Sequence, residues 1–329
     1  MSVKSAIHNL YAAPLRFASN IFDPPAVILI YHRVTDLEFD YNQLAVSPEN
    51  FNDQISYLTK NYNVVTAEEF YALITSRKKF PKHTALLTFD DGYADNLLEA
   101  LPILEAYNAQ AIFYITTSHL NTDKELWWDE LERIFLTDFH LPESIIISDG
   151  GNDYTLKTST VPQRIKIHNR WHKLFKSNLP DRREYFIENL KAWAELKDSG
   201  RSLYRMLTFE ELKKLHVSKS AVIGAHTHTH TVMSLLTKEQ QLSEMQQSKD
   251  ILEKLLNTKI EHASYPFGTK KDFNEDSIEV SKQLNFKMTC ANYHFQVHRW
   301  SNIHALPRIL VRDWNLQEFK KQVARFYCC

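Results

Sequence analysis

Two short segments of this sequence carry side chains that could together hold a metal ion. Asp90 and Asp91 are neighbours at the end of an apolar run, and His226 and His230 are four residues apart. If the second segment is helical, this spacing places both imidazoles on one face. Two histidines and one carboxylate are a common ligand set for a catalytic divalent metal, and the other carboxylate would be free to accept a proton from water. The pattern therefore predicts a metal-dependent hydrolase.

Each segment taken alone has a simpler interpretation. Adjacent aspartates before a helix are often N-caps, and a histidine cluster can arise by chance in a chain that contains 15 histidines. The occurrence of both segments in one chain favours the metal site. Imidazole and carboxylate ligands suit Zn²⁺, Co²⁺, Ni²⁺ or Fe²⁺, and they argue against Ca²⁺.

Short apolar runs alternate with helical patterns along most of the chain. This alternation predicts an α/β fold with a parallel sheet covered by helices, either open or closed into a barrel. The predicted strands are 27–31, 63–66, 85–89, 111–115, 221–224, 262–265, 286–290 and 308–311. The predicted helices of this part are 48–60, 67–77, 94–107, one that starts at 209, and 237–257.

The candidate residues follow the ends of several predicted strands. In α/β barrels this C-terminal edge carries the active site. His32 comes directly after the first strand, so it becomes a candidate proton donor, although a lone histidine is more often a packed or surface residue. The turn at Phe267 follows the strand 262–265, and its backbone N–H could face an oxyanion.

The alternation of strands and helices is interrupted between residues 126 and 204. Because it resumes afterwards, we expect an insertion beside the barrel rather than a separate domain. The insertion begins near Trp127 and Trp128, a pair that is either a sugar-stacking platform or a packing anchor. Its predicted elements are a hairpin around a glycine turn over 145–157 and two polar helices over 162–179 and 181–197.

Composition indicates an ordinary globular protein, with 43% apolar residues, 24% charged residues and a net charge of −1. No overall field favours nucleic acid as a partner, and we expect none. Three cysteines, two of them terminal neighbours, argue against a disulfide framework. Residues 1–25 lack the apolar core of a signal peptide and predict a helix packed on the domain, with peripheral membrane contact as the alternative. We expect a cytoplasmic protein.

Three segments resemble one known family. Leu87–Tyr93 is similar to the first motif of the polysaccharide deacetylases (NodB-type, carbohydrate esterase family 4), His226–His230 to their second and Tyr265–Gly268 to their third. The resemblance covers roughly 26–125 and 205–312. It implies a distorted (β/α)7-type barrel, formed by 26–125 and 205–329, with 126–204 as an inserted helical and hairpin segment.

The resemblance also implies roles for the candidate residues. Asp91, His226 and His230 would bind the metal, for which zinc is the first choice and cobalt or nickel are alternatives. Asp90 would be the general base. The backbone N–H near Phe267 would stabilise the oxyanion.

The sequence departs from the family pattern in two places. Ser264 stands where the third motif carries an arginine that orients the base, and Arg308 is our candidate for its replacement. The C-terminal acid histidine of the family is not obvious, and His304 is the nearest candidate. However, Ile30–Val34 resembles the N-terminal segment of the poly-N-acetylglucosamine deacetylases, whose strand order is circularly permuted and whose acid histidine comes first. We therefore favour His32 as the acid.

The function that the resemblance implies is removal of the acetyl group from an N-acetylated sugar of a glycan or lipopolysaccharide precursor. The sugar could be held on a lipid or a nucleotide, and we expect Trp128 and Tyr265 to contact it. A sugar N-deformylase or an O-acetyl esterase would use the same site. From another class, a catalytically silent glycan-binding protein is the alternative, against which the retained aspartates and histidines argue.

Overall fold

The computed structural model describes residues 20, 22–137, 141–149, 152–196 and 199–328. The helix predicted within residues 1–25 lies almost entirely outside them. The chain divides into two compact units. We call Met1–Thr117 together with Phe209–Cys329 the main unit, and Ser118–Thr208 the inserted unit. No described helix is long and apolar enough to cross a membrane.

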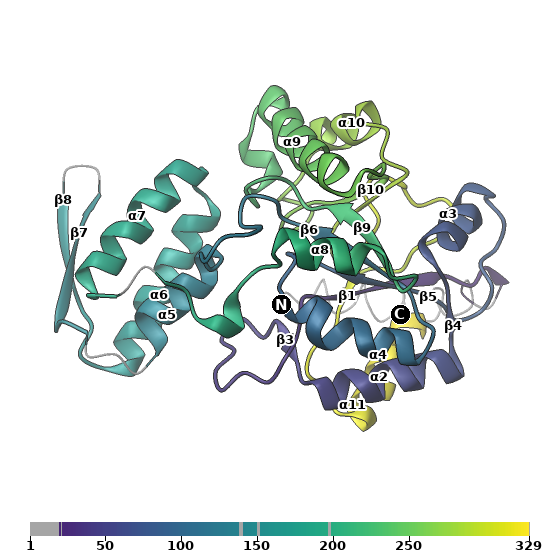
Figure 1. The fold of residues 1–329 in the computed structure, drawn as a ribbon, viewed down its shortest axis with the longest axis horizontal. Helices are drawn as coiled ribbons and strands as arrows, with labels where there is room; N and C mark the ends of the chain where they lie inside the picture. Colours follow the sequence, from purple (N-terminus) through teal and green to yellow (C-terminus); the bar gives the residue numbers. More distant parts are fainter. Residues whose placement is uncertain (1–19, 21, 138–140, 150–151, 197–198, 329) are drawn as a thin grey trace, which may run out of the picture. The chain divides into compact units, whose positions relative to one another are not determined.

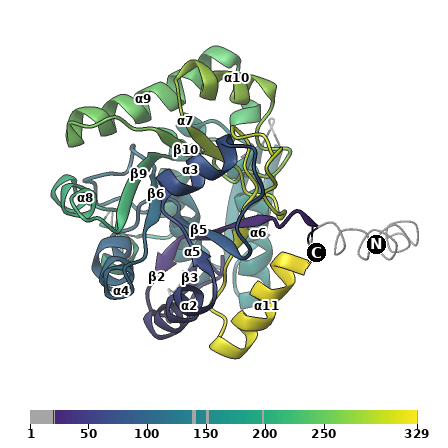
Figure 2. The ribbon, with the colours of Figure 1, turned by 90° about the vertical axis from the view of Figure 1, so that its right-hand side faces the viewer.

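A parallel sheet forms the centre of the main unit (Figures 1 and 2). Its strands lie side by side in the order β11 (Met288–Cys290), β10 (His262–Ser264), β9 (Ala221–Ala225), β6 (Ala111–Ile115), β5 (Thr84–Phe89), β1 (Ala26–Tyr31) and β12 (Ile309–Leu310), and β4 (Asn63–Val64) also pairs with β5. Each of these strands was predicted from the apolar runs. The sheet is a half-barrel with surrounding helices, which confirms the predicted fold class.

Helices cover both sides of this sheet. In Figures 1 and 2, α2 (Pro48–Asn61), α4 (Leu101–Ala106) and α11 (Leu316–Cys328) lie below the sheet. Helices α9 (Lys238–Leu256) and α10 (Glu275–Gln283) lie above it. The remaining helices of the unit are α3 (Ala67–Thr75) and α8 (Phe209–His216). The helix predicted over 94–107 begins as a π-helical turn at Asn96–Ala100 and continues as α4. A short parallel pair joins β2 (Arg33–Val34) to β3 (Ala45–Val46).

Side-chain caps set where several helices begin. The Ser47 hydroxyl accepts a hydrogen bond from the Asn50 N–H at the start of α2, and Pro48 occupies the first turn. Thr66 and Thr237 form capping boxes at the starts of α3 and α9. These bonds satisfy N–H groups that have no partner within the helix.

The central strands β1 and β5 are buried along their whole length. Helices on both faces of a parallel sheet require such strands to be apolar on both sides, which explains their uninterrupted apolar runs. At the C-terminal end, the Phe89 ring stacks on Tyr31 at 5.4 Å and on Phe113 at 4.8 Å between centroids. The strand ends that carry the candidate residues are thus held by packed aromatic rings.

The inserted unit combines a hairpin with three helices. The hairpin pairs β7 (Ser144–Asp149) with β8 (Asn152–Lys157), and the helices are α5 (Trp127–Leu136), α6 (Val161–Lys176) and α7 (Pro180–Trp193). Helix α5 was not predicted. Arg201 holds this unit together through buried carboxylates, at 2.8 Å from Glu125 and 3.3 Å from Glu132.

Close packing of β9 against β6 leads to a first prediction. A Cβ atom on Gly224 would lie 2.5 Å from Cδ1 of Tyr114 and 3.0 Å from the His262 carbonyl oxygen. We expect Gly224→Ala to lower the free energy of unfolding by about 1–3 kcal/mol in urea denaturation, because the sheet has to open to admit the methyl group. Val217→Ala, at an 80% exposed position, is the control and should change it by less than about 0.5 kcal/mol. An unchanged stability of Gly224→Ala would contradict this packing.

Candidate active site

The two aspartates follow β5 in a tight turn. The Asp90 N–H donates to the Tyr31 carbonyl at 3.0 Å, which extends the pairing of β5 with β1 by one residue. Asp91 has a φ of 75°, and the Gly92 N–H donates to the Asp90 carbonyl at 3.0 Å. These features are those of a γ-turn with a left-handed central residue, a rare and strained form. The turn brings two buried carboxylates to one site although they are adjacent in the chain.

The two histidines are brought together by a loop. The prediction of a helical turn over His226–His230 was wrong: Thr227 and His230 have φ values of 61° and 53°, which no right-handed helix contains. The loop is held from α9, where Glu244 accepts hydrogen bonds from the N–H groups of His228 at 3.1 Å and Thr229 at 2.8 Å. The rings of His226 and His230 still meet, with centroids 4.9 Å apart.

Asp91, His226 and His230 form a group whose ligand atoms all lie within 4.8 Å of one another. Oδ1 of Asp91 is 3.6 Å from Nε2 of His226 and 3.3 Å from Nε2 of His230. This Oδ1 is buried and has no hydrogen-bond partner in the part of the chain that the structure describes. Burial raises the pKa of Asp91, as expected for a carboxylate without a cation. The three side chains therefore fit a divalent cation.

Ser264 orients the His226 ring. Nδ1 of His226 lies 3.0 Å from the Ser264 carbonyl oxygen and 2.6 Å from its Oγ. A proton on Nδ1 satisfies the carbonyl and leaves the lone pair of Nε2 facing Asp91, which is the arrangement that a metal ligand needs. Burial lowers the pKa of His226, so the imidazole is neutral and able to act as a ligand.

Arg308 binds Asp90 through both carboxylate oxygens. Nη1 lies 2.7 Å from Oδ1 and Nη2 lies 2.6 Å from Oδ2, and Nε donates to the Ala291 carbonyl at 2.8 Å. The guanidinium is completely buried. Burial alone would raise the pKa of Asp90, but Arg308 and then His226 outweigh it and hold this pKa well below its usual range. Arg308 therefore lies against an ionised Asp90, at hydrogen-bond distance from both of its oxygens.

His32 lies at the same site and His304 does not. His32 is buried at the end of β1, and its carbonyl accepts a hydrogen bond from Asn96 at 2.9 Å. Burial lowers the pKa of His32, while Asp91 and Asp90 act to raise it. His304 instead contacts Ser281 of α10, with Nδ1 at 2.9 Å from Oγ, and no contact between His304 and either aspartate occurs among the described residues.

Of the other predicted site residues, Phe267 contacts His230 and Tyr265 is enclosed in the core. Phe267 has a φ of 58° in a second γ-turn, closed by the Gly268 N–H and the Pro266 carbonyl at 2.6 Å, and its ring contacts His230 at 4.9 Å. Tyr265 is fully buried, and its hydroxyl donates to the Ser277 and His304 carbonyls.

The structure does not agree with the predicted substrate contacts of Tyr265 and Trp128. Trp128 is in the inserted unit, 3% exposed and packed edge-on against Trp127 at 5.2 Å. Neither Tyr265 nor Trp128 presents an open face to a sugar, because each ring is enclosed by protein. The packing-anchor alternative describes Trp128 better.

A sequence profile of the family described as polysaccharide deacetylase matches residues 77–141 and 193–289, which contain both aspartates and both histidines of the site. The chain belongs to the polysaccharide deacetylase family. This family is that of the carbohydrate esterases of family 4, which are metal-dependent deacetylases. His32 and Arg308 lie outside the matched segments.

Similarity to individual polysaccharide deacetylases extends over more of the chain. This chain is 23% identical over 285 residues to the putative polysaccharide deacetylase YxkH of Bacillus subtilis (strain 168); the match covers 86% of this chain and 70% of that protein. It is 29% identical over 109 residues to the poly-β-1,6-N-acetyl-D-glucosamine N-deacetylase of Escherichia coli (strain K12), covering 32% of this chain and 16% of that protein. The structure of Streptococcus pyogenes deacetylase PplD in complex with acetate has the same fold, with a TM-score of 0.60 at 18% identity over 92% of this chain and 99% of that one.

The ion pair of Arg308 and Asp90 leads to a second prediction. In the native protein the lowered pKa of Asp90 contributes stability that is present above its unfolded-state pKa and is lost as the pH falls. Arg308→Met leaves the carboxylate buried without its counter-charge, so we expect a loss of about 3–5 kcal/mol of unfolding free energy at pH 7. Without Arg308 the pKa of Asp90 rises, so protonation should reduce this loss at pH 5.

Urea denaturation of the native protein and of Arg308→Met, each at pH 7 and pH 5, measures how much unfolding free energy the variant has lost at each pH. The double variant Asp90→Asn, Arg308→Met is the control, because it has no carboxylate to protonate at residue 90, and its deficit should vary less with pH. A deficit of Arg308→Met that is small, or that does not change between pH 7 and pH 5, would contradict the role given to this ion pair.

Proposed function

We propose that this protein is a metal-dependent N-deacetylase that removes the acetyl group from an N-acetylated amino sugar of a glycan or lipopolysaccharide precursor. The observation that carries the proposal is the arrangement around the two aspartates. Arg308 keeps Asp90 ionised and oriented, while Asp91 faces two histidines that can share a cation with it. A base beside a Lewis-acid site is what hydrolysis of an amide requires.

Each residue of the site has a separate role in the proposed reaction. A divalent cation held by Asp91, His226 and His230, with zinc as the first choice and cobalt or nickel as alternatives, would polarise the acetamide carbonyl and make water more acidic. Asp90 accepts the proton of the attacking water, and Arg308 fixes the plane of its carboxylate during that transfer. The backbone N–H at Phe267, next to His230, donates to the oxyanion.

His32 completes the reaction by giving a proton to the departing amine. The C–N bond then breaks, and the products are acetate and a free amino sugar. Because burial lowers the pKa of His32, its imidazole is neutral before the reaction, and the proton that Asp90 takes from water is the available source. The neighbouring carboxylates favour the protonated form while the proton is transferred.

A sugar N-deformylase or an O-acetyl esterase would use the same residues. The name of the Escherichia coli relative, a poly-β-1,6-N-acetyl-D-glucosamine N-deacetylase, supports an N-acetyl substrate. The presence of a candidate base, a candidate acid and three candidate ligands at one site supports an enzyme over a silent glycan-binding protein.

The ligand set is tested by metal content. We expect His226→Ala to lose most of the zinc that the native protein retains, about one ion per chain in elemental analysis, because it lacks one of three ligands. His228→Ala is a matched control from the same loop. Its Nδ1 lies 2.9 Å from Oγ1 of Thr117, and it is not part of the ligand group, so this variant should keep its zinc. Full zinc content in His226→Ala would refute the ligand set.

The base is tested by turnover. Asn has the shape of Asp but cannot take up the proton, so Asp90→Asn should release acetate from N-acetylglucosamine oligomers about 10²–10⁴-fold more slowly, as measured by mass spectrometry of the products. Its zinc content should equal that of the native protein. Near-native acetate release would exclude Asp90 as the base, and loss of zinc together with activity would make it a ligand instead.

A further inference from the structure

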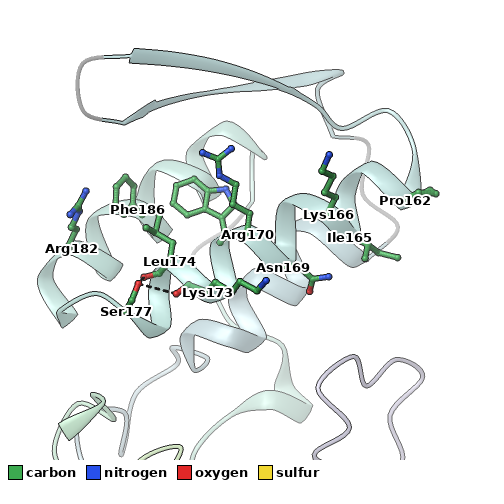
Figure 3. Close-up of a pocket in the computed structure, with 11 residues that line it drawn as sticks. Pro162, Ile165, Lys166, Asn169, Arg170, Lys173, Leu174, Ser177, Arg182 and Phe186 are labelled. Carbon is green, nitrogen blue, oxygen red and sulfur yellow. Dashed lines mark hydrogen bonds between the residues drawn. The ribbon is translucent and has the colours of Figure 1, made fainter. Parts of the chain in front are cut away.

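Two adjoining cavities occur in the inserted unit, apart from the residues of the proposed reaction. The larger one, of about 690 Å³, lies over α6 and α7 (Figure 3). The smaller one, of about 310 Å³, is lined by β7 and α7 together with Trp171 of α6. Trp171 and Phe186 line both cavities, so a single ligand could occupy the two at once.

The larger cavity is cationic. Four of its eleven lining residues are basic and none is acidic; the four are Lys166, Arg170, Lys173 and Arg182. Figure 3 shows Lys166 and Arg170 extending from the same side of α6. Helix α6 as a whole contains five lysines and arginines and no acidic residue. Such a concentration of charge in a chain with a net charge of −1 indicates an anionic ligand.

Two of the four basic residues, Lys166 and Lys173, are not neutralised by a neighbouring acid that the structure describes. On α7, Glu184 pairs with Lys124, and Glu188 lies 3.8 Å from Lys191. Within the described part of the chain, neither Lys166 nor Lys173 lies at ion-pair distance from a carboxylate. Their ammonium groups are therefore available to a phosphate, for which lysine is a common partner.

The smaller cavity is lined mainly by apolar and aromatic side chains, with Asn189 as the polar exception. Ile146 and Tyr185 line it, and each is 65% exposed. Covering these two side chains with hydrocarbon is favourable by about 25 cal/mol for each Å² removed from water. A basic cavity beside one lined mainly by apolar side chains suits a ligand with an anionic end and a hydrocarbon chain.

We propose that the inserted unit binds a lipid diphosphate, with its phosphates among the basic residues of α6 and α7 and its hydrocarbon chain against Ile146 and Tyr185. A nucleoside diphosphate would satisfy the charges but would leave the apolar cavity empty. This proposal depends on the proposed function at one point only: the lipid diphosphate is taken to carry the N-acetylated sugar that the enzyme deacetylates. Binding itself is measured without turnover, on a ligand that has no acetamide.

The experiment is titration calorimetry of the full chain with farnesyl diphosphate, farnesol, inorganic pyrophosphate and uridine diphosphate, and sedimentation with phosphatidylglycerol vesicles. We expect saturable binding of farnesyl diphosphate, at least about tenfold tighter than that of the other three ligands, because only it fills both cavities. Preference for uridine diphosphate, equal affinity for farnesol, or binding to vesicles without binding to farnesyl diphosphate would overturn the proposal.

Variants locate the site. Lys166→Gln with Lys173→Gln should weaken farnesyl diphosphate binding by about tenfold or more, since two charged hydrogen-bond donors are lost. The matched control, Lys254→Gln with Lys259→Gln, removes the same charge from exposed positions of the main unit and should leave binding unchanged. Equal effects of the two double variants would mean nonspecific charge attraction and would overturn the site.

Separate measurements test the smaller cavity and check that the variants are folded. Tyr185→Ser should weaken binding of farnesyl diphosphate but not of pyrophosphate, and an unchanged ratio would contradict the position of the chain. Circular dichroism confirms that each variant is folded. Acetate release from N-acetylglucosamine oligomers should be native in all three variants, so a failure of lipid binding remains distinguishable from a failure of the proposed deacetylase activity.

Discussion

The burial of Asp90 is the constraint on which the rest of the site depends. An ionised carboxylate that leaves water loses several kcal/mol of solvation, and an apolar sheet tolerates it only with a well-matched partner. Arg308 is that partner, because its planar fork meets both oxygens at 2.6–2.7 Å. The order of strands makes the contact possible: β12 lies beside β1, and β1 lies beside β5. The sheet topology and the ionisation state of Asp90 are therefore linked.

Strained backbone surrounds this ion pair. Asp91, Thr227, His230 and Phe267 all have left-handed φ values, a conformation that usually costs a non-glycine residue free energy and persists only where its surroundings enforce it. Here Glu244 fixes the histidine loop, and pairing with β1 and β6 fixes the ends of the aspartate turn. The positions of the candidate ligands are thus set by the protein itself, as expected of a preorganised site.

The parts that could be predicted from sequence are those with a local signal. The apolar runs of β1 and β5 revealed the sheet, and the family motifs revealed the aspartates and histidines. Helix α11 also has a local signal, since Phe319, Val323 and Phe326 form a buried stripe at helical spacing. In contrast, Glu244 is one polar residue among many on α9, and the burial of Tyr265 and Trp128 depends on tertiary packing. The i, i+4 spacing indicated two histidines whose rings do lie together, but a loop joins them and not a helical turn.

The position of Arg308 in the chain has a consequence for how the protein is made. A ribosome synthesises His32 and Asp90 early, but the arginine follows 218 residues after the aspartate. Until Ile309 and Leu310 pair with Leu29 and Ile30, β1 has an open edge and Asp90 of the nascent chain lacks its counter-charge. Contacts between residues so far apart form slowly. The ion pair of Arg308 and Asp90 therefore forms late, when the final strand joins the sheet.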